Sequence, residues 1–186
     1  MNPGEEPIPT LFITGAPGNG KTALARELSE ILWRVREPHA VIDLDELARG
    51  VLAERSLDFN LTLALENLAA VWANFYRHGV RRAVLARVIL SESDVTRLAA
   101  AIPSCDMTVC RVVADDVVAN RRIRERDPGL GADFLAAVGP EISDQLGELD
   151  LPGFTVQNNA STSITDLALE VLERANWPRP HRGEND

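Results

Sequence analysis

The sequence predicts a three-layer α/β fold, in which helices cover both faces of one parallel sheet of five strands. Short apolar runs of strand length alternate with longer segments whose apolar residues recur at helical spacing. This alternation is typical of parallel strands joined by right-handed helical crossovers. A second observation is the glycine-rich segment GAPGNGKT, which separates the first apolar run from the first helical segment. In parallel α/β proteins, a turn of this kind commonly binds phosphate.

The composition indicates one soluble globular domain. The chain has 186 residues, of which 45% are hydrophobic and 25% are charged. A chain of this length and composition is expected to fold around a single core. We expect the domain to span residues 1–178, followed by a disordered tail at 179–186.

The net charge and the lengths of the apolar runs restrict the partners and the location. A formal net charge of −9 argues against general nucleic-acid binding, because such proteins need a basic face to neutralise phosphates. The N-terminal residues show no targeting signal, and no apolar stretch approaches the roughly 18 residues that cross a bilayer. We therefore expect a cytoplasmic protein that binds neither nucleic acid nor membrane.

The first half of the chain is predicted to contain strands at 10–14 and 39–43 and helices at 24–35, 44–53 and 60–78. The first helix has apolar residues at helical spacing, at Leu24, Leu28, Ile31, Leu32 and Val35. The helix at 60–78 repeats this pattern at steps of three and four, with Leu61, Leu65, Leu68, Trp72 and Phe75. Gly79 follows where a helix C-cap is expected.

The second half is predicted to contain strands at 83–90, 107–113 and 154–157. The run at 83–90 is mostly apolar on both faces, as a central parallel strand should be. Helices are expected between and after these strands, through residues 91–101, 115–126 and 132–149 and from residue 163 onward. Two of them begin at a serine followed three residues later by an aspartate, a spacing typical of helix N-termini, at Ser91–Asp94 and Ser163–Asp166.

Cys105 and Cys110 are the only cysteines and lie in or beside one predicted strand. Their odd separation would place them on opposite faces of that strand, so we expect free thiols and no internal disulfide.

The segment Gly15–Thr22 has the spacing G-x-x-x-x-G-K-[ST] of a phosphate-binding loop. The glycines let successive backbone N–H groups point at the β-phosphate of a nucleotide, next to the positive end of a helix. Lys21 is expected to reach the β- and γ-phosphates, and the Thr22 hydroxyl to ligate Mg²⁺. The predicted nucleotide-binding residues are Gly15, Ala16, Pro17, Gly18, Asn19, Gly20, Lys21, Thr22 and Ala23. The motif predicts binding of ATP or GTP with Mg²⁺ and leaves the reaction open.

Two carboxylates, Asp43 and Asp45, follow the predicted strand at 39–43. In parallel sheets this edge forms the ligand crevice. A carboxylate there can hold magnesium in place, as expected for Asp43 beside Thr22, and one can accept a proton from an attacking hydroxyl. Helix capping is an alternative role for either residue, and the residues do not decide which of the two acts as base.

Three arginines are candidates for contacts with phosphate or acceptor. Arg122 and Arg126 lie four residues apart on one helix face, and as an arginine-rich lid near residues 120–131 they could close over a transferring phosphoryl group. A solvated basic helix is the alternative. Arg87 interrupts the apolar run AVLARVIL, where a charge needs a partner. It could pair with Asp43 or Asp45, or bind an anionic group of the acceptor.

These motifs together resemble the adenylylsulfate kinase group of P-loop small-molecule kinases, which are related to nucleoside monophosphate kinases. That group carries D-G-D-N-[IV]-R after its second strand, where this chain has Asp43-Leu-Asp45-Glu-Leu-Ala-Arg49. Its E-N pair is matched by Glu66-Asn67, and its E-R-D-P by Glu125-Arg126-Asp127-Pro128. The resemblance spans roughly Leu11 to Leu130.

The resemblance implies the strand order 2-3-1-4-5, a purine site near Asn158–Ser161, acceptor contacts from Arg49 and Asn67, and dimers. The chain departs from the family at two arginines that serve adenylylsulfate recognition, because Ala48 and Ala64 stand at the corresponding positions. Adenylylsulfate is therefore not assigned as the substrate.

The sequence thus predicts an ATP-dependent phosphotransferase that moves the γ-phosphoryl group to a hydroxyl or a phosphate of a small metabolite. The expected catalytic residues are Lys21, Asp43, Asp45, Arg122 and Arg126. The alternatives are a nucleoside or nucleotide kinase and a non-catalytic ATP- or GTP-binding switch or sensor. A switch is expected to carry D-x-x-G and N-K-x-D motifs, whereas the corresponding segments here read VILSESD and TVQNN.

Overall fold

The computed structural model describes residues 6–50, 53, 60–126 and 130–180, and it confirms the predicted fold class. Five parallel strands form one sheet in the order β2-β3-β1-β4-β5, which is the order that the family resemblance implies. The strands are β1 (Ile8–Thr14), β2 (Ala40–Asp43), β3 (Ala83–Ala86), β4 (Cys105–Val113) and β5 (Gly153–Gln157).

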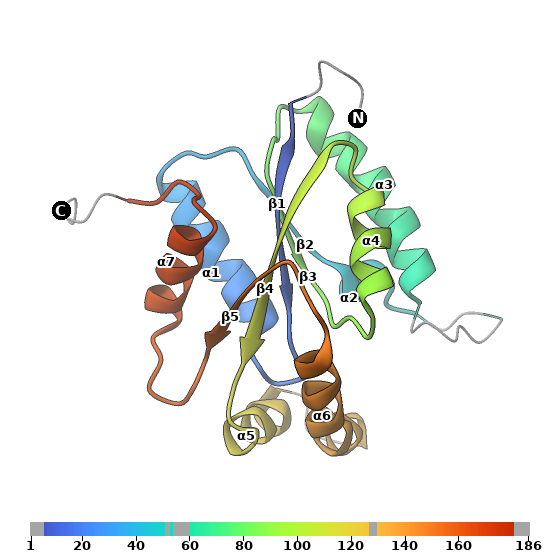
Figure 1. Ribbon diagram of the computed structural model, residues 1–186, viewed down its shortest axis with the longest axis vertical. Helices are drawn as coiled ribbons and strands as arrows, with labels where there is room; N and C mark the ends of the chain where they lie inside the picture. The colour runs from blue at the N-terminus through green and yellow to red at the C-terminus, as the bar shows by residue number, and fades with distance from the viewer. Residues whose placement is uncertain (1–5, 51–52, 54–59, 127–129, 181–186) are drawn as a thin grey trace.

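Helices cover both faces of the sheet and its carboxyl edge. They are α1 (Lys21–Arg34), α2 (Leu44–Leu47), α3 (Leu61–Arg77), α4 (Glu92–Ala100), α5 (Asp116–Arg126), α6 (Leu130–Glu148) and α7 (Ile164–Arg174). Figure 1 shows α1 and α7 against one face and α3 and α4 against the other, with α5 and α6 beyond the ends of the strands. None of the helices in the described ranges is long and apolar enough to cross a membrane.

The strands divide their side chains between two apolar cores, because successive strand residues point to opposite faces. Along β1, Ile8 and Phe12 join the core under α3 and α4, whereas Leu11 and Ile13 join the core under α1 and α7. The two cysteines of β4 follow the same rule: Cys105 packs at the first core and Cys110 lies in the second. Both are free thiols, as predicted.

Two predicted elements end earlier than expected. The strand predicted at 83–90 ends at Ala86, although the Arg87 N–H still donates to the Ile13 carbonyl at 3.1 Å. The helix predicted at 44–53 ends at Leu47. Side chains of the α3 region bind the carbonyls that a further turn would use, since Asn67 donates to Leu47 O at 2.7 Å and Asn60 donates to Ala48 O at 3.3 Å.

The predicted helix starts at Ser91 and Ser163 are confirmed. Each hydroxyl accepts a hydrogen bond at 3.3 Å from the backbone N–H three residues later, at Asp94 and Asp166. At the other end of the chain, the predicted tail at 179–186 is only partly described: Arg179 binds Glu173 at 2.9 Å, and residues 181–186 lie outside the described residues.

The Thr14 hydroxyl, at the carboxyl end of β1, is the one buried side-chain polar atom in the described residues that has no hydrogen-bond partner. A buried unsatisfied hydroxyl is destabilising, and valine has the same shape without the polar atom. We expect Thr14→Val to raise the free energy of unfolding by about 1 kcal/mol in urea titrations. Thr10→Val is the matched control, because Thr10 is equally buried but donates to Ile8 O at 3.1 Å. That variant should lose stability, and a loss in both variants would contradict this account.

Candidate functional site

The glycine-rich loop between β1 and α1 is packed tightly against two other segments. Gly18 and Gly20 have φ angles of 80° and 96°, which side chains with a Cβ rarely adopt. A Cβ on Gly18 would lie 2.4 Å from the Ala119 carbonyl oxygen of α5, and one on Gly20 would lie 2.3 Å from Asn158 Nδ2. The loop therefore needs glycine both for its conformation and for its contacts with α5 and with the segment after β5.

A network of amides and one guanidinium fixes the loop to the ends of β4 and β5. Asn19 donates to Val112 O at 2.9 Å, and Asn158 donates back to Asn19 O at 2.8 Å; both side chains are 3% exposed. Arg122 of α5 donates to Asn158 O at 3.0 Å and to Asn158 Oδ1 at 3.3 Å. Arg122 thus lies at the segment where the family resemblance implies a purine site, and it holds that segment next to the loop.

Lys21 folds back over the loop. Its Nζ donates to Gly15 O at 2.8 Å and to Ala16 O at 3.2 Å. Burial lowers the pKa of Lys21 from 10.5 to about 8, against the opposing charges of Asp45 and Asp43. The Lys21 ammonium group, held against the loop carbonyls, is in a position suited to binding a phosphate. The negative charge of a bound phosphate would raise the pKa of Lys21 again.

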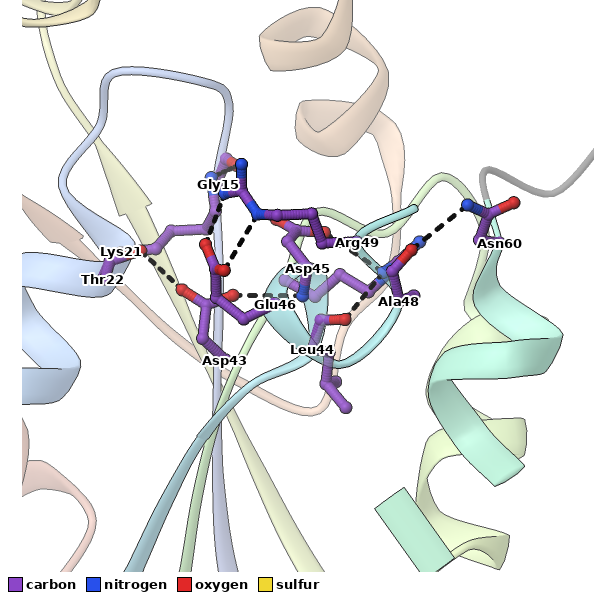
Figure 2. Close-up of polar contacts among 11 residues, drawn as sticks. Gly15, Lys21, Thr22, Asp43, Leu44, Asp45, Glu46, Ala48, Arg49 and Asn60 are labelled. Carbon is purple, nitrogen blue, oxygen red and sulfur yellow. Dashed lines mark hydrogen bonds and ion pairs between the residues drawn. The ribbon is translucent and has the colours of Figure 1, made fainter. Parts of the chain in front are cut away.

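Asp43, the last residue of β2, connects α1, the helix that follows the loop, with α2 (Figure 2). One of its carboxylate oxygens accepts from the Thr22 hydroxyl at 2.8 Å, and the other accepts from the Asp45 N–H at 3.1 Å. The predicted capping role is therefore confirmed for Asp43, which caps α2 with one oxygen and accepts from Thr22 with the other.

The oxygens of Thr22 and Asp43 suit a magnesium ion that arrives with phosphates. Magnesium prefers oxygen ligands and commonly takes one or two from the protein, with the rest from phosphates and water. Within the described residues, no group of three or more His, Cys, Asp or Glu side chains could hold a metal alone. Thr22 and Asp43 are thus the residues that would hold magnesium here.

Asp45 forms an ion pair with Arg87, whose Nη1 lies 3.1 Å from Asp45 Oδ1. Arg87 is 5% exposed, and its Nη1 also lies 3.4 Å from Leu44 O. The sequence left open whether Asp43 or Asp45 is its partner, and the structure shows Asp45. Partial burial raises the pKa of Asp45, while the charges of Arg87 and Lys21 oppose that rise. Asp45 is therefore a half-exposed carboxylate beside the loop lysine.

Arg126, the last residue of α5, is exposed. Its charge lowers the pKa of Lys21 and that of Glu46 in α2, so it lies within electrostatic reach of both. The remaining residues of the predicted lid at 120–131 are described only in part, because 127–129 lie outside the described residues.

The two predicted acceptor residues near α2 have partners within the chain. Arg49 binds Glu46 at the exposed end of α2, with a contact of 2.5 Å, and Asn67 of α3 donates to Leu47 O. Ala48 and Ala64, where the family has arginines, are 6% and 0% exposed and belong to the core under α3 and α4.

Sequence reasoning missed Arg111 of β4, which lies in register beside Thr14. Its guanidinium donates to Leu146 O of α6 at 2.7 Å and to the Thr155 hydroxyl of β5 at 3.2 Å. The signal was present, because Arg111 interrupts the apolar run MTVCRVV in the way that Arg87 interrupts AVLARVIL. Its role is to join α6 to the sheet at the site edge.

Comparison with solved structures identifies the same fold in P-loop kinases. The Deinococcus radiodurans tunicamycin resistance protein matches with a TM-score of 0.64 at 17% identity, over 93% of this chain and 98% of that chain. A gluconokinase from Sinorhizobium meliloti 1021 matches with a TM-score of 0.58 at 18% identity, over 92% and 94%. The Mycobacterium tuberculosis APS kinase CysC, solved with AMPPNP and APS, also gives 0.58 at 18%, over 92% and 99%.

The sequence comparisons gave no match, either to a protein-family model or to a curated protein. At identities this low, the structural likeness establishes the fold: the chain has the P-loop kinase fold and is similar to APS kinase.

We expect the amino group of Lys21 to titrate near pH 8 instead of 10.5. Lys21 is the only lysine in the 186 residues, so a small amine-reactive reagent modifies this side chain and the N-terminal amine, which peptide mapping separates. The modification rate of Lys21 against pH reports its pKa. Asp45→Asn should lower that pKa further, because Asp45 is the largest of the charges that raise it.

The exposed Glu30→Gln on α1 is the control and should leave the titration unchanged; a midpoint near 10.5 in the wild-type protein would contradict the burial of this amine. Because the folded pKa lies below the unfolded one, Lys21 destabilises the fold below pH 8, and this penalty is relieved as the pH rises from 8 towards 10.5.

Proposed function

We propose that the protein is an ATP-dependent kinase that transfers the γ-phosphoryl group of ATP to a hydroxyl of a small metabolite. The observation that carries this proposal is the convergence of three groups at one sheet edge: the loop lysine, the Thr22–Asp43 pair and the Asp45–Arg87 pair. The P-loop kinase fold of the solved neighbours supports it.

The glycine-rich loop and Lys21 bind the triphosphate in this proposal. Successive loop N–H groups face the β-phosphate, and the amino group that now binds the Gly15 and Ala16 carbonyls turns to the β- and γ-phosphates. Magnesium, held by Thr22 and Asp43, supplies charge neutralisation to the phosphates. The segment Asn158–Ser161 receives the purine, and Arg122 positions that segment through its bonds to Asn158.

Asp45 is the general base in this proposal, and Asp43 is not. Both oxygens of Asp43 already accept hydrogen bonds, from Thr22 and from the backbone of α2. Asp45 is half-exposed, and its pKa is raised, which suits a group that gains a proton. The acceptor hydroxyl gives its proton to Asp45 while its oxygen bonds to the γ-phosphorus. The bond from that phosphorus to the β-phosphate oxygen breaks, and ADP leaves.

Arg126 neutralises charge on the transferring group. It is exposed at the end of α5, within electrostatic reach of Lys21, so its guanidinium would act on the phosphates that Lys21 binds. Guanidinium groups stabilise the charge of a loose phosphoryl-transfer transition state.

We expect Lys21→Ala to lose nucleotide binding and turnover, and Asp45→Asn to lower kcat by about 10²- to 10⁴-fold with nucleotide affinity retained. Calorimetry with MgAMPPNP measures the affinity, and ADP release in the presence of acceptors measures turnover. Asp43→Asn should instead raise the magnesium concentration needed for half-maximal turnover.

Asp144→Asn, an exposed change of the same kind on α6, is the control and should match the wild type. Normal turnover in Lys21→Ala would overturn the proposal. Nucleotide binding without ADP release for every acceptor tested would favour a non-catalytic nucleotide sensor.

A further inference from the structure

We propose that the phosphoryl acceptor is a hydroxyl compound with no phosphate, sulfate or carboxylate group: an uncharged polyol or nucleoside, or a cationic amino alcohol. This inference rests on the proposed kinase function and specifies its acceptor. The inference rests on one observation: the described arginines around α2, the end of β3 and α4 are each paired with an acid of the same chain.

Arg87 and Arg49 are each paired with an acid of α2. Arg87, buried at the end of β3, binds Asp45 at 3.1 Å, and Arg49 binds Glu46 at 2.5 Å. An anionic acceptor would have to compete with these carboxylates for the guanidinium groups. If the anion displaced Asp45 or Glu46 from its arginine, the displaced carboxylate would lie beside the incoming anion. The repulsion between these two negative charges is unfavourable.

Arg97 of α4, on the same side of the sheet, is also compensated. Its guanidinium lies 3.8 Å from Asp94 and donates to the Thr62 hydroxyl of α3 at 2.8 Å. Ala48 and Ala64, where the family has arginines, are uncharged and buried in the core next to α2 and α3. The described arginines on the acceptor side are therefore neutralised within the chain.

In the described residues around α2 and the start of α3, acids outnumber bases. The described residues 43–50 and 60–67 contain four acids, Asp43, Asp45, Glu46 and Glu66, and one base, Arg49. The cations that face the loop, Lys21 and Arg126, are engaged by the transferring phosphates in the proposed reaction. A second anion on the acceptor would approach Asp45 and Glu46, whereas a hydroxyl or an ammonium group would meet no such repulsion.

Matched acceptor pairs test this inference. ADP release from MgATP is measured with a nucleoside against its monophosphate, a sugar against its sugar acid, and an amino alcohol against the corresponding hydroxy acid. Lys21→Ala is measured alongside, so that only turnover dependent on the loop lysine is counted. We expect kcat/KM to be at least about tenfold higher for the uncharged or cationic member of a productive pair, which corresponds to one close charge repulsion.

The outcomes separate this inference from the proposed function. Lys21-dependent turnover that favours the anionic members would overturn the acceptor class and leave the kinase proposal standing. Absence of Lys21-dependent ADP release with every acceptor would overturn both. Among productive pairs, the amino alcohols and the uncharged compounds then distinguish a cationic acceptor from a neutral one.

A charge-removing variant gives a second test. Glu46 is exposed and takes no part in the proposed transfer, so Glu46→Gln should keep turnover of the preferred acceptor near wild type. It should also remove one negative charge beside the proposed base, and thereby raise the kcat/KM of the anionic member relative to its neutral partner by about three- to tenfold. Glu30→Gln, the same change on α1 away from α2, should leave the ratio unchanged. An unchanged ratio in Glu46→Gln would contradict the role assigned to the charge of Glu46.

Discussion

The site depends on the two hydrogen bonds that the Asp43 carboxylate accepts. One oxygen holds the Thr22 hydroxyl at the start of α1, and the other caps α2 through the Asp45 N–H. Because α2 has only four residues, it is held in place by this cap, by the bond from Asn67 to Leu47 O and by the buried Leu44 side chain. The position of α2 in turn places Asp45 against Arg87. In the proposed kinase, a single carboxylate would thus align the residues that hold magnesium with those that face the acceptor.

The electrostatics of the loop follow from the same arrangement. Lys21 is buried against loop carbonyls and would be costly as an unaccompanied charge, and burial is the main cause of its lowered pKa. Asp45 and Asp43 offset part of that cost without binding the amino group directly. The lysine is therefore still mostly protonated at pH 7, but its positive charge is only partly balanced within the chain, so the negative charge of a polyphosphate would stabilise it.

The sequence was sufficient to predict those features of the site that depend on residues close together in the chain. The loop spacing, the position of Asp43 at the end of its strand and the need of Arg87 for a partner could all be predicted, because each depends on a few adjacent residues or on a charge in an apolar run. The contacts between residues far apart in the sequence could not be predicted. Arg122 binds Asn158, 36 residues away, and Asn67 ends α2 from α3. Such pairings depend on how elements pack, which no periodicity encodes.

The basic and acidic side chains near the proposed site lie on different elements. Arginines gather on α5, where Arg122 reaches the segment after β5 and Arg126 faces the loop, whereas acids gather at α2 and neutralise the arginines near it. A net charge of −9 is compatible with ATP binding, because the positive charge is concentrated where the triphosphate would lie. In the proposed reaction, the same division would make α2 unfavourable for a second anion, so the acids near α2 would select against anionic acceptors without opposing nucleotide binding.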